Sequence, residues 1–145
     1  MEMWKCHTTQ KQLPLPDEDS QVFWEACRRQ RLVIQQCVTC RRYRFPPSPL
    51  CPACLSPRLA WREDPGRGEI ETFCVYYSAL AGPAWQPDLP YVVAVIRLWH
   101  TGVQLLSQIR CEDPSAISIG LAVEVIFEPA REQVVLPKFV PVAAP

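Results

Sequence analysis

The sequence predicts a mainly β protein in which a short N-terminal helix precedes a four-cysteine ribbon and a small five-stranded barrel. Three observations lead to this prediction. One stretch near the N-terminus has apolar residues at helical spacing, two Cys-x-x-Cys pairs follow it, and five short apolar runs without intervening helices fill the C-terminal half. The 145 residues suit one compact unit or two very small ones.

The composition excludes two classes of protein. The 15 basic residues balance 15 acidic ones, and 48% of the residues are hydrophobic. General disorder requires high net charge and few apolar residues, and a globally basic nucleic-acid binder requires an excess of positive charge, so both are excluded. No apolar run approaches the ~20 residues of a membrane helix, and the N-terminus lacks a signal-peptide pattern, so we expect a cytoplasmic protein.

A short helix is expected between residues 16 and 29, after an arm formed by residues 1–15. The acidic residues 17–19 would place negative charge in its first turn, where the helix dipole favours it. Apolar residues at helical spacing share one face, with Trp24 beside it; they are Val22, Phe23, Ala26 and Cys27. We expect this face to pack against the rest of the chain or against a partner, with ligand binding as the alternative. Residues 32–34 are β-prone and lead into the first cysteine pair.

Four cysteines have the spacing of metal ligands. Cys37-x2-Cys40 is followed after ten residues by Cys51-x2-Cys54. Two residues between cysteines allow a tight turn to aim both sulfurs at one point, so two such turns supply four thiolates in a tetrahedron. In a reducing compartment this pattern favours metal binding over disulfide bonds. We therefore predict one structural zinc ion in a rubredoxin-like ribbon spanning residues 34–64.

Two other interpretations of these cysteines stay open, namely redox or disulfide pairs and iron in the same four-sulfur site. A closed tetrahedron leaves no position for water or substrate, so the predicted ion is structural rather than catalytic. The remaining cysteines have no paired spacing and are expected to be small buried apolar residues. They are Cys6, Cys27, Cys74 and Cys111.

Five β-like runs follow a Pro-Gly turn at residues 65–68. They cover residues 70–77, 91–99, 103–109, 123–127 and 134–139. Five short strands without alternating helices favour a small closed barrel, of which the OB-fold is the best known five-stranded form; a small sandwich or an SH3-like barrel is the alternative. Residues 79–90 form a Pro-rich loop centred on Trp85, and loops of this length often carry function. The expected divisions are 1–33 for arm and helix, 34–64 for the ribbon and 65–145 for the OB-fold.

Charge is uneven along the chain although it sums to zero. Residues 28–67 carry nine arginines and two acidic residues, whereas the segments before and after are net negative. Three of these arginines, Arg41, Arg42 and Arg44, lie between the cysteine pairs. Such a basic face attracts the phosphates of nucleic acid or of a phosphorylated cofactor. The alternative is a solvated surface or a contact with an acidic partner.

Catalytic motifs are missing from the sequence. Neither His7 nor His100 stands in a motif with a Ser or Cys nucleophile, and there is no Gly-x-Ser-x-Gly elbow or Walker loop. The adjacent acidic pairs 63–64 and 112–113 flank turns and are expected to be solvated. We therefore expect that the chain is not an enzyme on its own.

Five segments resemble one known family, the acyl-CoA-associated zinc-ribbon/OB-fold proteins called domain of unknown function thirty-five. FWEACRRQRLVIQQCVTC (23–40) looks like the family's entry helix and first knuckle, and RFPPSPLCPAC (44–54) like its proline-bracketed second knuckle. GRGEIETFCVYY, LPYVVAVIRL and IGLAVEVIFE resemble its glycine turn and two of its barrel strands; they are residues 66–77, 89–98 and 119–128. Gln30-Arg31 departs from the family, which often has Gly at this turn.

The resemblance implies a non-catalytic accessory subunit. Its partner would be a thiolase-like enzyme (condensing, retro-aldolase or acyltransferase) or a hydratase-type enzyme acting on acyl-CoA thioesters, and the subunit would help to hold the CoA portion or complete the partner's site. The residues that we expect to contact CoA or the partner are Arg41, Arg42, Arg44, Phe23, Trp24 and Trp85. The alternative is a single-stranded nucleic-acid-binding ribbon/OB protein; against it, residues 68–145 carry four basic and eight acidic residues.

Overall fold

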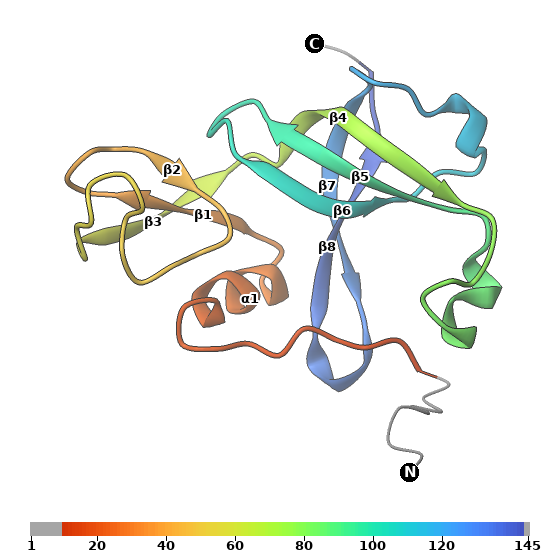
Figure 1. The fold of residues 1–145 in the computed structure, drawn as a ribbon, viewed down its shortest axis with the longest axis horizontal. Helices are drawn as coiled ribbons and strands as arrows, with labels where there is room; N and C mark the ends of the chain where they lie inside the picture. Colours follow the sequence, from red (N-terminus) through yellow and green to blue (C-terminus); the bar gives the residue numbers. More distant parts are fainter. Residues whose placement is uncertain (1–9, 144–145) are drawn as a thin grey trace.

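The computed structural model describes residues 10–143 of the chain. A three-stranded sheet and a five-stranded closed barrel lie side by side, with one helix beneath the junction (Figure 1). Cys6 and His7 lie outside the described residues. The expected succession of helix, ribbon and barrel is therefore confirmed.

The helix α1 spans Gln21–Arg28 and starts later than the sequence predicts. The acidic residues expected in its first turn precede it, because residues 17–20 form a separate turn. In that turn the Ser20 backbone N–H donates to Asp17 Oδ1 at 2.8 Å, and the Gln21 N–H donates to the Asp17 carbonyl at 2.9 Å. Phe23 and Cys27 are buried, which confirms the predicted packing of this face, although Val22 is exposed.

The turn after α1 is built on Gln30, which has a left-handed φ of 58°. The Arg31 N–H donates to the Ala26 carbonyl and the Gln30 N–H to the Cys27 carbonyl, both at 2.9 Å. This pair of bonds is the Schellman arrangement, in which glycine is the preferred left-handed residue. The chain thus makes a glycine-type turn without glycine, and the turn directs the chain into the ribbon.

The ribbon sheet has β1 (Leu32–Cys37) at its centre, between β2 (Tyr43–Arg44) and β3 (Leu59–Asp64), with both pairings antiparallel. Leu32 and Ile34 of β1 are fully buried and belong to the same apolar cluster as the barrel interior. The ribbon therefore shares a core with the barrel at its near end, whereas its far end, beyond Cys37, has little apolar filling of its own.

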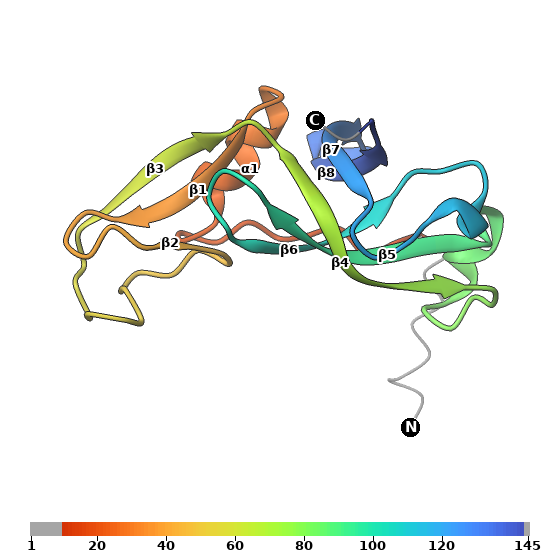
Figure 2. The ribbon, with the colours of Figure 1, turned by 90° about the horizontal axis from the view of Figure 1, so that it is seen from above.

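The barrel closes in the order β4-β5-β6-β8-β7. Its strands are β4 (Arg67–Tyr76), β5 (Tyr91–Leu98), β6 (Gln104–Ile109), β7 (Ala122–Pro129) and β8 (Val135–Pro141). All neighbours are antiparallel except β6 and β8, which run parallel and are paired at Ile109 and Phe139. This Greek-key closure is the OB-fold, so the predicted barrel is confirmed and the sandwich is excluded. Figure 2 shows β7 and β8 crossing over one side of the β4-β5-β6 layer.

Two glycines at the ribbon–barrel junction allow neighbouring segments to pack closer than a side chain would permit. Gly66 has a φ of +75°, and a Cβ there would lie 2.1 Å from Val125 Cγ1; a Cβ on Gly68 would lie 2.2 Å from the Arg97 carbonyl oxygen. Close approach of β4 to its neighbours accounts for this Gly-x-Gly. Next to it, Asp64 is buried, so the expectation that the pair 63–64 is solvated was wrong for Asp64.

Candidate functional site: a four-cysteine centre and an apolar cavity

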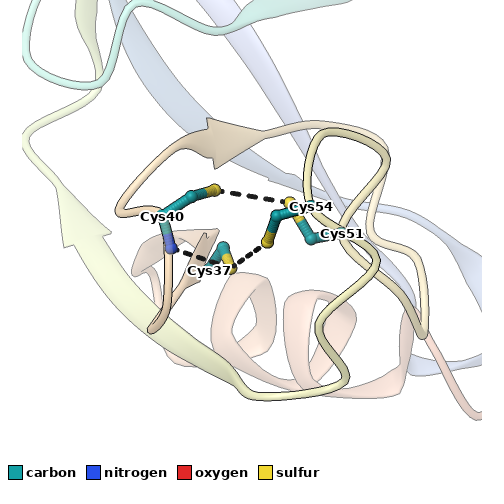
Figure 3. Close-up of side chains that lie close together, drawn as sticks. All are labelled: Cys37, Cys40, Cys51 and Cys54. Atoms are coloured by element: carbon teal, nitrogen blue, oxygen red, sulfur yellow. Dashed lines mark hydrogen bonds between the residues drawn. The ribbon is translucent and has the colours of Figure 1, made fainter.

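The four paired cysteines converge at the far end of the ribbon. Their sulfurs all lie within 4.8 Å of one another, with 3.6 Å between Cys37 and Cys54 and 3.6 Å between Cys40 and Cys51 (Figure 3). Sulfurs at the corners of a tetrahedron with Zn–S bonds of ~2.3 Å are about 3.8 Å apart. The observed separations fit that geometry, and they are too long for the ~2.05 Å bond of a disulfide.

The two knuckles repeat one local structure. The Arg41 N–H donates to the Cys37 carbonyl at 2.9 Å, and the Leu55 N–H donates to the Cys51 carbonyl at 2.8 Å. Arg41 and Leu55, each directly after the second cysteine of its pair, have left-handed φ values of 65° and 61°. This tight turn brings both sulfurs of a pair to the same side. The hydroxyls of Thr39 and Ser56, 2.8 Å apart, join the tips of the two knuckles.

Backbone N–H groups favour the thiolate form in both knuckles. The Cys40 N–H, 3.4 Å from Cys37 Sγ, lowers the pKa of the Cys37 thiol to about 6. The Cys54 N–H likewise lowers the pKa of the Cys51 thiol. Thiolates are the form that binds metal. Four convergent sulfur ligands, with the thiolate form favoured at the first cysteine of each pair, fit a closed structural zinc site.

The remaining described cysteines are not uniformly buried. Cys27 is buried, and this burial raises the pKa of its thiol to about 12. Cys74 is exposed because its side chain lies on the outward face of β4, and Cys111 is half-buried. The expectation of burial is thus confirmed for Cys27 and wrong for Cys74.

The predicted arginine cluster divides into two environments. Arg41 and Arg42 are exposed at the first knuckle. Arg44, on β2, points into the ribbon, where its Nε donates to Gln35 Oε1 at 2.7 Å and one terminal nitrogen donates to the Ser48 carbonyl at 2.5 Å. Arg44 therefore holds the proline-rich loop onto β1, and the exposed positive charge comes from Arg41 and Arg42.

The three predicted aromatic residues, by contrast, line one cavity of about 590 Å³. Phe23 is buried, with ring centroids 5.1 Å from both Trp24 and Phe45. Trp85 reaches the cavity from the loop between β4 and β5, where residues 83–88 form a short 3₁₀ helix. Another wall of the cavity consists of residues 105–108 of β6 and 136–139 of β8. The cavity thus occupies the seam where these two strands part.

A charged network that the sequence analysis missed lies beside this cavity. Glu128 accepts hydrogen bonds from Arg110 (2.5 and 2.7 Å) and from Lys138 Nζ (2.6 Å). The Arg110 guanidinium lowers the pKa of Glu128 to about 2, and burial lowers the pKa of Lys138. Glu128 and Lys138 line the cavity. No local motif signals this network, because its members come from separate segments.

Comparison with known proteins agrees with both parts of the fold. Residues 24–60 match the family model described as the ChsH2 rubredoxin-like zinc ribbon domain, and residues 61–128 match that of the ChsH2 C-terminal OB-fold domain. The chain is 33% identical to a DUF35 domain-containing scaffold protein of Methanothermobacter thermautotrophicus, over 73% of this chain and 78% of that protein. The chain belongs to the DUF35 family.

Two further relatives carry enzyme names. This DUF35 chain is 34% identical to a probable enoyl-CoA hydratase alpha subunit of Thermomonospora curvata, over 88% of its own length but 39% of that subunit. Among solved structures, it matches a chain of the Ltp2-ChsH2(DUF35) aldolase with a TM-score of 0.81 and 33% identity, over 90% of this chain and 100% of that chain. A DUF35 structure from Sulfolobus solfataricus, 13% identical with a TM-score of 0.60, shares the fold.

Within residues 10–143, the longest α-helix has 8 residues, and no helix could cross a membrane.

Proposed function

We propose that this DUF35 protein is a non-catalytic accessory subunit of an enzyme complex acting on acyl-CoA thioesters. One observation carries the proposal, namely that the chain is similar over its fold to the whole DUF35 chain of a named aldolase. The hydratase alpha subunits of Thermomonospora curvata and Mycobacterium tuberculosis support it. The partner would be thiolase-like (condensing, retro-aldolase or acyltransferase) or hydratase-type, and the complex would be cytoplasmic.

Within this role we propose one zinc ion on Cys37, Cys40, Cys51 and Cys54. The ion would hold the far end of the ribbon, including the exposed pair Arg41 and Arg42, in a fixed position. These two arginines would attract the CoA phosphates or dock on an acidic patch of the partner. Arg44 would act indirectly, because its guanidinium is bound inside the ribbon.

Co-expression with candidate acyl-CoA enzymes, taken from the reading frames next to this chain where these encode one, tests the assembly. We expect a stable hetero-oligomer on size exclusion and a partner activity that rises when the complex forms. The double change Arg41→Gln and Arg42→Gln should weaken assembly or the affinity for CoA ester, whereas the exposed Arg29→Gln should change neither. A chain that stays monomeric beside the enzyme and leaves its activity unchanged would contradict the proposal.

The same preparation tests the nucleic-acid alternative. Phosphate contacts make such binding strongly salt-dependent. Titration with a labelled single-stranded oligonucleotide at low and high salt should show no saturable binding if the chain is an accessory subunit.

A further inference from the structure

We infer that the cavity between β6 and β8 is a binding site for an organic carboxylate with a large apolar body. The inference goes beyond the accessory role, since it concerns a ligand of the chain itself. It rests on three features: where the cavity lies in the barrel, how its walls are composed, and which charges lie in its wall and directly beside it.

The cavity exists because the barrel seam is open. β6 and β8 are paired at Ile109 and Phe139, and away from this pair they are joined by a bond from Ser107 Oγ to the Pro137 carbonyl at 2.7 Å. Residues 10–13 of the N-terminal arm, Phe23 and Trp24 of α1, and Trp85 line the cavity together with these two strands. In Figure 1 the arm runs beneath α1 and across the β7–β8 hairpin. A volume of about 590 Å³ is that of a site for a small organic molecule.

The walls favour an apolar body. Phe23, Trp24 and Phe45 form one aromatic wall, and Trp85 forms another. Leu106, on β6, is 73% exposed although it lines the cavity, so an apolar ligand would cover a side chain that water now contacts. Removal of such apolar surface from water favours complex formation.

The charges favour an anion. The network of Arg110, Lys138 and Glu128 contains two cations and one carboxylate, so it has a net charge of +1 at neutral pH. Lys138 is 7% exposed and donates to Glu128, and an ammonium has three N–H donors in all. A carboxylate entering the cavity would accept from Lys138 and balance the surplus charge, whereas an uncharged ester or alcohol would leave that charge unbalanced.

The arm provides a closure for the site. Lys11 forms an ion pair with Asp88, and its ammonium lies 4.7 Å from the Trp85 ring centroid. Arg131, in the β7–β8 turn, donates to the Lys11 carbonyl. Lys11 therefore ties the arm to both rims of the cavity, and release of these contacts would open it.

Calorimetric titration of the zinc-loaded chain (residues 1–145) with decanoate tests the inference, with 1-decanol as a neutral match and free CoA as a third titrant. We expect saturable 1:1 binding of decanoate, weaker binding of decanol and no competition by CoA. Lys138→Met should weaken decanoate about tenfold or more and leave decanol unchanged, while the exposed Arg29→Met should have no effect. Trp85→Ala should weaken both titrants, in contrast to Trp99→Ala outside the cavity.

A second variant keeps the test valid if Lys138→Met does not fold. Leu106→Asp places a negative charge at an exposed position on the cavity rim and should weaken decanoate but not decanol; Ile119→Asp, equally exposed elsewhere, is its control. No decanoate binding, equal affinity for decanoate and decanol, or displacement of decanoate by CoA would overturn the inference. Assembly with the acyl-CoA enzyme is measured separately, so either proposal can fail alone.

Discussion

Asp64 at the end of β3 accepts a 2.7 Å hydrogen bond from the hydroxyl of Thr101, in the turn between β5 and β6. The other carboxylate oxygen of Asp64 accepts from the Gly66 N–H at 2.8 Å. One buried side chain thereby joins the last ribbon strand to the barrel and fixes the turn between them. This contact, the shared core around Leu32 and Ile34, and the glycine junction together hold the ribbon at a set angle to the barrel.

Asp64→Ala should lower the free energy of unfolding by about 1–3 kcal/mol, because the buried Gly66 N–H and the Thr101 hydroxyl lose their acceptor. The neighbouring Glu63→Ala is the matched control, because Glu63 pairs with Arg31 on the exposed face of the same strand. The free energy of unfolding of this variant should stay close to that of wild type. Urea denaturation measures both. Equal losses in the two variants would show that Asp64 has no special role at the junction.

Loss of the metal should unfold the far end of the ribbon before the rest of the protein. β1 is anchored at Leu32 and Ile34 in the shared core, and Tyr43 and Phe45 pack against that core, whereas the turns at residues 38–41 and 52–56 depend on the knuckles. Cys37→Ser should reduce the zinc content from about one ion per chain to near zero, and hydrogen exchange should accelerate in residues 38–41 and 52–56. Cys74→Ser, at an exposed cysteine outside the site, should keep both properties. Full zinc content in Cys37→Ser would contradict the ligand assignment.

Gln30→Gly should stabilise the protein by about 1 kcal/mol, since a left-handed φ strains any residue with a Cβ. Arg29→Gly is the control one residue earlier, where φ is −95° and glycine relieves no strain. The melting temperature should therefore rise for Gln30→Gly and fall or stay constant for Arg29→Gly. A lower melting temperature for Gln30→Gly would mean that the Gln30 side chain makes a contact worth more than the backbone strain.

Sequence patterns predicted an element correctly where a single physical requirement, such as metal coordination or burial of apolar side chains, determines its structure. The sulfur spacing determines the knuckles, and the five apolar runs coincide with β4 to β8 because each must fill the barrel interior. The start of α1 was placed too early, since residues 17–20 satisfy their own hydrogen bonds in a turn. Asp64 and the network of Glu128 were missed because their burial and partners depend on segments far away in the chain. The cavity has the same origin, as it forms where β6 and β8 separate.

The Glu128 network should give the protein a specific sensitivity to acid. Arg110 and Lys138 lower the pKa of Glu128 from an ordinary value near 4.5 to about 2 in the folded state. A lowered carboxyl pKa contributes stability that is complete above about pH 4.5 and is lost as the pH falls toward about 2, because the unfolded chain takes up the proton first. Glu128→Gln should therefore be less stable than wild type at neutral pH, with a difference that shrinks through this window. Glu124→Gln, at an exposed position on the same strand, should have the free energy of unfolding of wild type at every pH. Denaturation curves recorded at a series of pH values measure all three proteins. A gap between Glu128→Gln and wild type that stayed constant from neutral pH to about pH 2 would show that the charge of Glu128 contributes nothing to folding.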